Sequence, residues 1–390
     1  MRYVCPACGP DGLLDPLYDY ERARGDFPRA HAAGIARYLS ILPIKNPAHL
    51  PPLLVGGTPL TRGDRLAREL GLQHLFLKED NRSLTGSFKD RASAVAVAAA
   101  LDEGERLITG ASTGNAASSL AGMAAALGLT TVIFVPARAP RAKITQLLVY
   151  GAHVLLVDGS YDDACDLSLE ATRRYGWYNR NTGYNPVCLE GKKTAALEIW
   201  EDLGREAPEA VFVPVGDGCI IGGIGKGFMD LRRMGLIDRL PRLYGCQAEG
   251  SAVLSKCQDG RIVAEPDAST VADSICVGYP RAASQALRAV RESQGSWLVV
   301  TDDEILEAQQ RVARSTGVFG EPACSAAAAG LFQAVEKGLV GGDERIAIIV
   351  TGSGLKDVEG AMKGPCGQGI PVPRNPEGLE AALRQIPGLL

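Results

Sequence analysis

The stretch Thr85-Gly-Ser-Phe-Lys89-Asp-Arg91 decides the fold class, because it places one lysine between a turn of small residues and an apolar helix. Residues 92–101 are almost wholly Ala and Val, which predicts a tightly packed helix. A lysine at a helix start lies in the positive potential of the helix end, and partial burial lowers its pKa further. An amine with a lowered pKa suits Schiff-base chemistry, although most lysines are simply solvated.

Short apolar runs alternate with helical patterns on both sides of this stretch. The expected strands are residues 75–78, 107–109, 131–135, 153–157, 210–215, 242–246 and 345–350. Strands bounded by glycine and separated by helices are typical of parallel sheets covered on both faces. A chain of 390 residues also exceeds what one hydrophobic core usually organises. The sequence therefore predicts an α/β fold with two open parallel-sheet lobes.

The composition is that of an ordinary globular protein, with 46% hydrophobic and 22% charged residues. The net charge is −4 and the basic residues are scattered, which argues against a nucleic-acid partner. The apolar runs are too short to span a bilayer, and no N-terminal secretory signal is visible, so we expect no membrane partner. Ten scattered cysteines favour free thiols over a disulfide framework. We expect a cytoplasmic protein.

Three polar loops follow expected strands, and open α/β sheets bind their ligands at such strand ends. The first loop, residues 109–115, brings Ser112, Thr113 and Gly114 to a helix N-terminus, where N–H groups and hydroxyls can hold a carboxylate. Asn115 can donate to a phenolate oxygen. An N-capping loop also favours Ser, Thr and Asn, but four such residues with two glycines exceed what a cap needs.

The second loop, residues 215–227, is rich in glycine from Gly216 onward. Glycines let a backbone approach a phosphate closely, and the helix end supplies a positive potential. A loose glycine-rich turn is a weak signal by itself and also fits a dinucleotide site.

The third loop offers the hydroxyl of Thr351 or Ser353 at the end of a strand, and its alternative interpretation is a common Ser/Gly turn. Such a neutral hydroxyl suits a pyridine nitrogen. A lysine, a carboxylate loop, a phosphate loop and this hydroxyl together fit one pocket for pyridoxal 5′-phosphate (PLP).

In these motifs the chain resembles the tryptophan-synthase-β class of PLP enzymes (fold type II) and, within it, the threonine synthase family. The motif Gly-Ser-Phe-Lys-Asp-Arg is complete at 86–91, Ser-Thr-Gly-Asn at 112–115 and Thr-Gly-x-Gly-Leu-Lys at 351–356. Leu-Glu-Gly-Lys-Lys-Thr at 189–194 resembles a further stretch of that family. The resemblance covers about residues 55–360.

The resemblance implies a role for each candidate residue. Lys89 would be the catalytic residue and form the Schiff base with PLP. The other implied cofactor contacts are Asn115 at the ring oxygen, the backbone of Gly216, Asp217, Gly218, Cys219 and Ile220 at the phosphate, and Thr351, with Ser353 as the alternative, at the pyridine nitrogen. The implied substrate-carboxylate contacts are Ser112, Thr113 and Gly114.

We expect three parts in the chain. They are an N-terminal arm (1–50) with a partial Cys-x-x-Cys knuckle, a large PLP-binding domain (51–95 and 196–375) and a small domain (96–195). PLP would lie in the cleft between the two lobes of the chain. We expect the protein to form a homodimer and to act on a small amino-acid substrate.

The neutral hydroxyl also bears on the reaction. It cannot hold a full positive charge on the pyridine nitrogen, so expulsion of a leaving group is favoured over transamination. With the resemblance, this predicts a carbon–oxygen lyase of amino-acid biosynthesis that converts O-phosphohomoserine and water to threonine and phosphate. A cysteate synthase-like replacement on O-phosphoserine and a Ser/Thr dehydratase fit the core motifs as well. A nucleotide-binding oxidoreductase and a catalytically silent binding protein are alternatives of other classes.

Two residues depart from the threonine synthase pattern. Cys188 stands where that family has an arginine assigned to the substrate phosphate, and a thiol cannot replace a bidentate guanidinium contact. Asp217 stands where an asparagine is usual, and an acid beside a phosphate requires that its side chain point away. Arg180, Lys192 and Lys193 lie nearby in sequence, but we expect them to be exposed.

The segment Cys5-Pro-Ala-Cys8 resembles one half of a zinc ribbon. No second Cys pair and no histidine pair follows in the arm at a matching spacing, so we expect no metal ion there.

Overall fold

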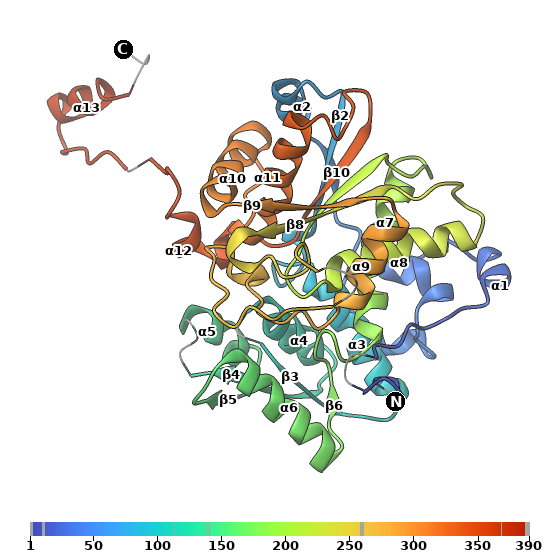
Figure 1. The fold of residues 1–390 in the computed structure, drawn as a ribbon. Helices are drawn as coiled ribbons and strands as arrows, with labels where there is room; N and C mark the ends of the chain where they lie inside the picture. The colour runs from blue at the N-terminus through green and yellow to red at the C-terminus, as the bar shows by residue number, and fades with distance from the viewer. Residues whose placement is uncertain are drawn as a thin grey trace.

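The computed structural model describes residues 3–9, 12–112, 114–137, 139, 141–257, 261–367 and 369–386, and within these residues two α/β lobes are present (Figure 1). The large lobe holds a six-stranded sheet of order β1-β2-β10-β7-β8-β9, parallel except for the β1–β2 pair. The small lobe holds a four-stranded parallel sheet of order β5-β4-β3-β6. The expected fold class is therefore confirmed.

The strands and helices alternate along the chain as α/β folds require. The strands are β1 (Leu60–Arg62), β2 (His74–Glu79), β3 (Leu107–Ala111), β4 (Thr130–Pro136), β5 (His153–Val157), β6 (Tyr178–Asn179), β7 (Ala210–Pro214), β8 (Arg242–Ala248), β9 (Ser296–Val300) and β10 (Arg345–Val350). The α-helices are α1 (Tyr20–Arg24), α2 (Asp64–Leu70), α3 (Lys89–Asp102), α4 (Asn115–Ala125), α5 (Arg141–Val149), α6 (Tyr161–Tyr175), α7 (Val187–Asp202), α8 (Cys219–Arg233), α9 (Ala283–Glu292), α10 (Asp302–Thr316), α11 (Pro322–Glu336), α12 (Val358–Ala361) and α13 (Pro376–Leu383). Short 3₁₀ helices are η2 (Gly34–Ile41), η3 (Pro47–His49), η4 (Asp80–Arg82), η5 (Glu249–Ser251), η6 (Asp273–Ile275) and η7 (Gly354–Lys356).

The large sheet is covered on both faces, and this burial explains why its inner strand β7 is apolar throughout. Val211 and Val213 belong to one hydrophobic cluster, which includes residues of α3, α7, α8 and α9. Ala210 and Phe212 belong to a second cluster, built with α2, α10 and α11. Successive side chains of a strand point to opposite faces, so a strand buried on both faces needs a continuous apolar run.

The N-terminal arm packs against the large lobe through two tyrosines. The hydroxyl of Tyr18 donates to Glu190 Oε2 at 2.6 Å, and that of Tyr20 donates to Asp230 Oδ1 at 2.8 Å. At the other end of the chain, α13 extends away from the two lobes (Figure 1). The domain bounds 51–95, 196–375 and 96–195 stay a proposal, which the distribution of the strands between the two sheets supports.

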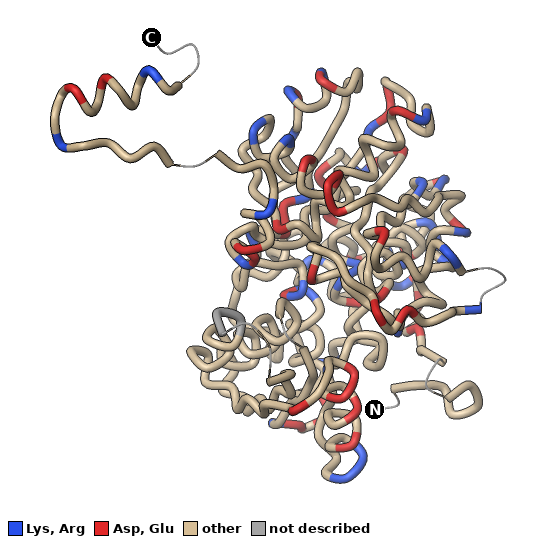
Figure 2. Tube along the Cα trace, turned by 60° about the vertical axis from the view of Figure 1, so that its left-hand side comes forward, with Lys and Arg blue, Asp and Glu red and all other residues tan. Residues whose placement is uncertain are grey.

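Charged residues of both signs are interspersed along the chain, and Figure 2 shows acidic and basic positions side by side on both lobes. No helix in the described part of the chain is long and apolar enough to cross a membrane.

Candidate active site

A cavity of about 740 Å³ lies where the carboxyl ends of strands from both sheets meet. Pockets of 300–1,000 Å³ are typical of small-molecule sites. The expected site residues that line it are Lys89, Ser112, Gly114, Asn115, Gly216, Asp217, Gly218, Cys219, Ile220 and Thr351. Within the described chain, Ser353 is not part of the lining; its hydroxyl accepts from Leu355 N at the start of η7. Thr113 lies outside the described residues.

The turn before Lys89 is held against the loop after β10. Phe88 N donates to Thr351 O at 2.8 Å, and Ser353 N donates to Gly86 O at 2.9 Å. Gly86 has a φ of +81°, in the left-handed region that favours glycine. These bonds bring the first and last motifs of the sequence together and set Lys89 and Thr351 on the wall of one pocket.

Lys89 is the first residue of α3 and is half-buried in the pocket wall. Burial lowers its pKa to about 8, and the positive charges of Lys192 and Arg180 act in the same direction, while Glu321 opposes them. A larger share of this amine is therefore neutral near physiological pH than in an ordinary lysine.

The neighbours of Lys89 in the motif have structural roles. Asp90 accepts from the backbone N–H of Thr85 at 2.8 Å and so closes the turn. Arg91 is fully buried and bonds Asp80 at 2.7 Å and Glu198 at 2.6 Å. A buried guanidinium needs such paired carboxylates, since an unpaired buried charge is costly.

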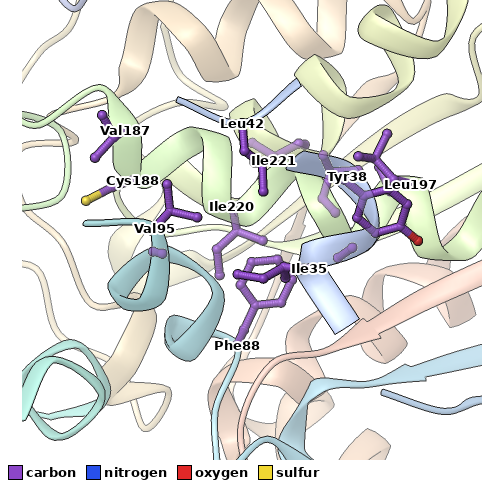
Figure 3. Packing of buried hydrophobic residues seen from close by; sticks show 14 of the residues in the cluster. Ile35, Tyr38, Leu42, Phe88, Val95, Val187, Cys188, Leu197, Ile220 and Ile221 are labelled. Carbon is purple, nitrogen blue, oxygen red and sulfur yellow. The ribbon is translucent and has the colours of Figure 1, made fainter. Parts of the chain in front are cut away.

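Phe88 lies on the other side of the turn, in the apolar cluster that includes Ile35 and Ile220 (Figure 3). Lys89 is thus fixed on one side by packing and on the other by the ion pairs of Arg91.

The glycine-rich loop after β7 runs directly into the N-terminus of α8 at Cys219. A Cβ at Gly216 would lie 2.8 Å from the backbone of Ile275, and Gly218 has a φ of +87°. Glycine is therefore required at both positions, and the free N–H groups of the first helical turn are available to an anion.

The Asp217 side chain is held by the segment before α9. The side-chain Oδ1 of Asp217 accepts from Arg281 N at 3.2 Å, and the backbone carbonyl of the same residue accepts from Ala282 N at 3.0 Å. Burial raises the pKa of the Asp217 carboxyl. Both effects reduce the repulsion between this acid and an anion on the loop.

Glu321 is a pocket residue that the sequence did not predict. It is buried, and both of its oxygens accept from Asn115 Nδ2, at 3.0 and 3.1 Å. Burial raises its pKa. In the sequence, Glu321 stands directly before Pro322 at the start of the small-residue helix α11. An acidic residue followed by proline is typical of an ordinary helix start, so this pattern gives no sign of a pocket residue.

The expectation that Lys193 is exposed is wrong. It is fully buried, and its ammonium pairs with Glu190 at 2.6 Å and Asp230 at 2.7 Å. The same Glu190 accepts from Tyr18, so this charge cluster joins α7, α8 and the N-terminal arm.

The same expectation is wrong for Arg180 and Lys192, which are buried and line the pocket. Cys188 is also buried, in the cluster that includes Val95 and Val187 (Figure 3), and its Sγ donates to Arg180 O at 3.3 Å. The thiol therefore anchors the backbone of one of the two pocket cations.

The residues present fit pyridoxal phosphate. The pocket offers an amine of lowered pKa, a glycine loop at a helix N-terminus and a neutral hydroxyl at a strand end. Lys89 would hold the cofactor covalently, the N–H groups of the loop 216–220 would hold its phosphate, and Thr351 would meet the pyridine nitrogen.

Cys5 and Cys8 lie in a turn of the arm, closed by a bond from Gly9 N to Cys5 O at 3.0 Å. Among the described residues, no group of three or more His, Cys, Asp or Glu side chains could hold a metal ion.

Comparisons with known proteins agree on one family. The family described as pyridoxal-phosphate dependent enzyme matches residues 52–352. The chain is 39% identical to the threonine synthase of Methanocaldococcus jannaschii, over 93% of this chain and 90% of that protein. It is 38% identical to the threonine synthase of Mycobacterium tuberculosis, over 84% and 90% of the two chains.

Solved structures agree with the sequence relatives. The processed form of threonine deaminase isoform 2 from Solanum lycopersicum has a TM-score of 0.66 at 25% identity, covering 79% of this chain and 84% of that one. Maize serine racemase, at 22% identity and a TM-score of 0.65, covers 76% and 89% and shares the fold.

Proposed function

The chain belongs to the family of pyridoxal-phosphate dependent enzymes, and on that premise we propose that it is a threonine synthase, which converts O-phosphohomoserine and water to threonine and phosphate. The observation that carries the proposal is Lys89, whose pKa of about 8 and position in the pocket suit covalent attachment of the cofactor. The 39% identity to a threonine synthase over nine-tenths of both chains supports the choice of reaction.

The pocket residues supply binding and proton transfer. Bound PLP supplies the electron sink that makes the substrate Cα proton acidic. Lys89 Nζ, when it is free as an amine, can take that proton and return it, because a pKa of about 8 suits both directions near neutral pH. The Ser112 hydroxyl, which accepts from Gly114 N at 3.1 Å and keeps its own O–H as a donor, would orient the substrate carboxylate at the start of α4.

Asn115 is positioned by Glu321. Both Glu321 oxygens accept from the same Asn115 Nδ2, and a carboxylate can share one N–H between its two oxygens, which orients the amide and leaves the second N–H for the cofactor ring oxygen. A fixed amide costs less to align with the cofactor ring oxygen than a mobile one. Thr351 would leave the pyridine nitrogen uncharged, which favours loss of a leaving group.

The test uses the purified, PLP-loaded enzyme with O-phosphohomoserine, and measures threonine and phosphate together. Lys89→Ala should lose at least about a hundredfold in kcat and lose the absorbance band of lysine-bound PLP. Lys256→Ala, which removes an exposed lysine far along the chain, is the matched control and should behave as the parent.

O-phosphoserine with sulfite, threonine alone and serine alone should be assayed as substrates under the same conditions. Turnover of threonine or serine without turnover of O-phosphohomoserine would replace the proposal by the dehydratase alternative, for which the likeness to threonine deaminase is the supporting observation. Turnover of O-phosphoserine with sulfite alone would indicate the cysteate synthase alternative. The family match decides against a nucleotide-binding oxidoreductase.

We also propose that the enzyme works in the cytoplasm, as a homodimer, without a nucleic-acid or membrane partner. Unpaired cysteines throughout the described structure support a reducing compartment. The interspersed charges of Figure 2 support the absence of a polyanion partner. Light scattering of the purified holoenzyme would give the oligomeric state directly.

A further inference from the structure

Two buried cations of the pocket have donor atoms without an acceptor. Lys192 is fully buried, and within the described residues its Nζ has no hydrogen-bond partner. Arg180 donates from Nε to Ser93 Oγ at 3.2 Å and from Nη1 to Thr182 Oγ1 at 2.9 Å. Its buried Nη2 has no acceptor in the described part of the chain. Buried cations without acceptors are unfavourable unless an anion completes them.

Both cations are fixed in place by the fold. Arg180 follows β6 directly; its N–H donates to Thr109 O at 2.9 Å, and its carbonyl accepts from Cys188 Sγ at 3.3 Å. Lys192 lies where α7 crosses α8 at close range, since a Cβ at Gly223 would lie 2.7 Å from Lys192 Cβ. The two donors therefore need little rearrangement to bind an anion, which favours affinity.

The position of Lys192 on α7 explains how it can supply a charge that Cys188 lacks. Cys188 and Lys192 are four residues apart in the helix, so they share one face. The threonine synthase resemblance places an arginine at position 188, and here a positive charge lies one turn later, at Lys192. Arg180 supplies a planar, multidentate donor, which suits phosphate oxygens.

The proposed cofactor contacts do not include these two donors, although the charge of Lys192 also opposes the rise in the pKa of Asp217 and Cys219 in the phosphate loop. The phosphate of the cofactor would be held by the N–H groups of the loop 216–220, and its covalent bond would take up the amine of Lys89. Two cations that line the same pocket are then left for a second anion. Their charges also lower the pKa of Lys89, whose amine lines the same pocket.

We propose that Arg180 and Lys192 form the subsite for the phosphate monoester on the substrate side chain, and that the product phosphate leaves from it. The inference rests on the proposed function for the identity of the leaving group, but the anion site itself follows from the two donors. A substrate phosphate bound there would lie in the same pocket as Lys89, and so would the oxygen that links this phosphate to the substrate carbon.

The test measures binding of inorganic phosphate to the PLP-loaded enzyme by calorimetry, since the cofactor phosphate already fills its own loop. It also measures KM and kcat for O-phosphohomoserine and the dissociation constant of PLP. Lys192→Gln and Arg180→Gln should each weaken phosphate binding and raise KM by at least about tenfold, with PLP affinity within about twofold of the parent. Arg173→Gln, which removes an exposed charge on α6, is the control and should change none of these.

The outcomes separate the subsite from the function. Loss of PLP affinity with unchanged phosphate binding would assign the cations to the cofactor and overturn the proposal. Phosphate binding that depends on both residues, in an enzyme that does not turn over O-phosphohomoserine, would support the subsite and remove the proposed function. If Lys192→Gln fails to fold, Arg180→Gln and the charge-keeping Lys192→Arg are measured in its place. Phosphate binding that Arg180→Gln leaves unchanged would then overturn the proposal.

Discussion

Lys89 and Arg91 are two residues apart, yet one serves the pocket and the other serves the core. Lys89 lines the cavity, whereas Arg91 is buried among Asp80 and Glu198. The helix geometry explains the difference, because neighbouring residues of a helix point to different sides. A short motif can thus combine a reactive amine with the ion pairs that hold it in place.

The lowered pKa of Lys89 predicts how the apoenzyme takes up its cofactor. Only the neutral amine attacks the aldehyde of PLP, so the rate should rise with pH and reach half of its maximum near pH 8. An unperturbed lysine would give that midpoint near its ordinary pKa, about 10.4. Stopped-flow absorbance of the apoenzyme mixed with PLP at pH values on both sides of 8 measures the midpoint. A rate that is still rising steeply above pH 10 would contradict the assignment of Lys89.

The raised pKa of Glu321 predicts a stabilising substitution. Burial lifts this pKa above its unfolded value, so the native state favours the protonated carboxyl, and that stability is lost as pH rises through the folded pKa. Glu321→Gln keeps an acceptor for Asn115 and removes the ionisation. The free energy of unfolding of the variant apoenzyme should therefore exceed that of the parent at about pH 8, and the difference should shrink toward about pH 4.

Urea unfolding at several pH values checks this prediction. The expected gain is about 1.4 kcal/mol for each unit by which the pKa is raised. A variant that is less stable than the parent across the whole range would show that ionised Glu321 stabilises the fold.

At the scale of single elements, α7 shows how one helix serves three environments. Glu190 and Lys193 lie in the charge cluster with Asp230, and Lys192 lines the pocket. Gly191 allows α7 to lie against α3, because a Cβ there would lie 2.1 Å from Arg91 O. The close crossing of the two helices therefore sets the positions of both Lys89 and Lys192.

Gly191→Ala should break this crossing. Alanine favours a helix by up to about 1 kcal/mol over glycine, but here the methyl meets a backbone carbonyl that cannot rotate away. Overpacking of this kind costs about 1–3 kcal/mol, so we expect a net loss of stability and weaker PLP binding. Urea unfolding measures the first effect and spectroscopic titration with PLP the second.

The control for that substitution is Gly367→Ala, at a glycine whose Cβ would meet no atom within 4 Å. It should change the free energy of unfolding by no more than about 0.5 kcal/mol. Equal stability of the Gly191 variant and the parent would mean that α3 and α7 can separate without cost.

The strands were predictable from sequence to different degrees. All seven expected strands are present, because each is a short apolar run of parallel sheet; β7 and β10 are buried almost throughout, whereas β5 is mostly exposed. The described residues add β1, β6 and β9, which were not expected. The strand β6 has only two residues, and its place depends on pairing with β3 across a long stretch of chain. Local patterns hold no information on such pairings.

The site shows the same division. Loops that follow predicted strands were found, since topology alone brings strand ends together. Glu321 and Arg180 were missed or misjudged, because their burial depends on contacts with residues far away in sequence, such as Asn115 and Ser93. A charged residue in isolation is most often exposed, and only the packed fold overrides that expectation.

At the scale of the whole molecule, the pocket is a joint product of two lobes. Ser112 and Arg180 come from the ends of strands in the small sheet, and Gly216 and Thr351 from the ends of strands in the large one. An ion pair between Arg281 and Asp162 on α6, at 2.9 Å, joins the lobes beside the pocket. A ligand held by groups of both lobes therefore couples their stabilities.

This coupling predicts the effect of the cofactor on unfolding. PLP that binds only the folded pocket should stabilise it by about 2.7 kcal/mol at one hundred times the dissociation constant, and both lobes should share the gain. The holoenzyme should therefore unfold in one transition at a higher temperature than the apoenzyme. Calorimetry follows this transition, and so does the fluorescence of Trp177 in the small lobe and of Trp200 and Trp297 in the large one. Lys89→Ala, which keeps the phosphate loop and loses the covalent bond, should retain only part of the shift. Two separate transitions, of which PLP moves one alone, would show that the cofactor is held by a single lobe.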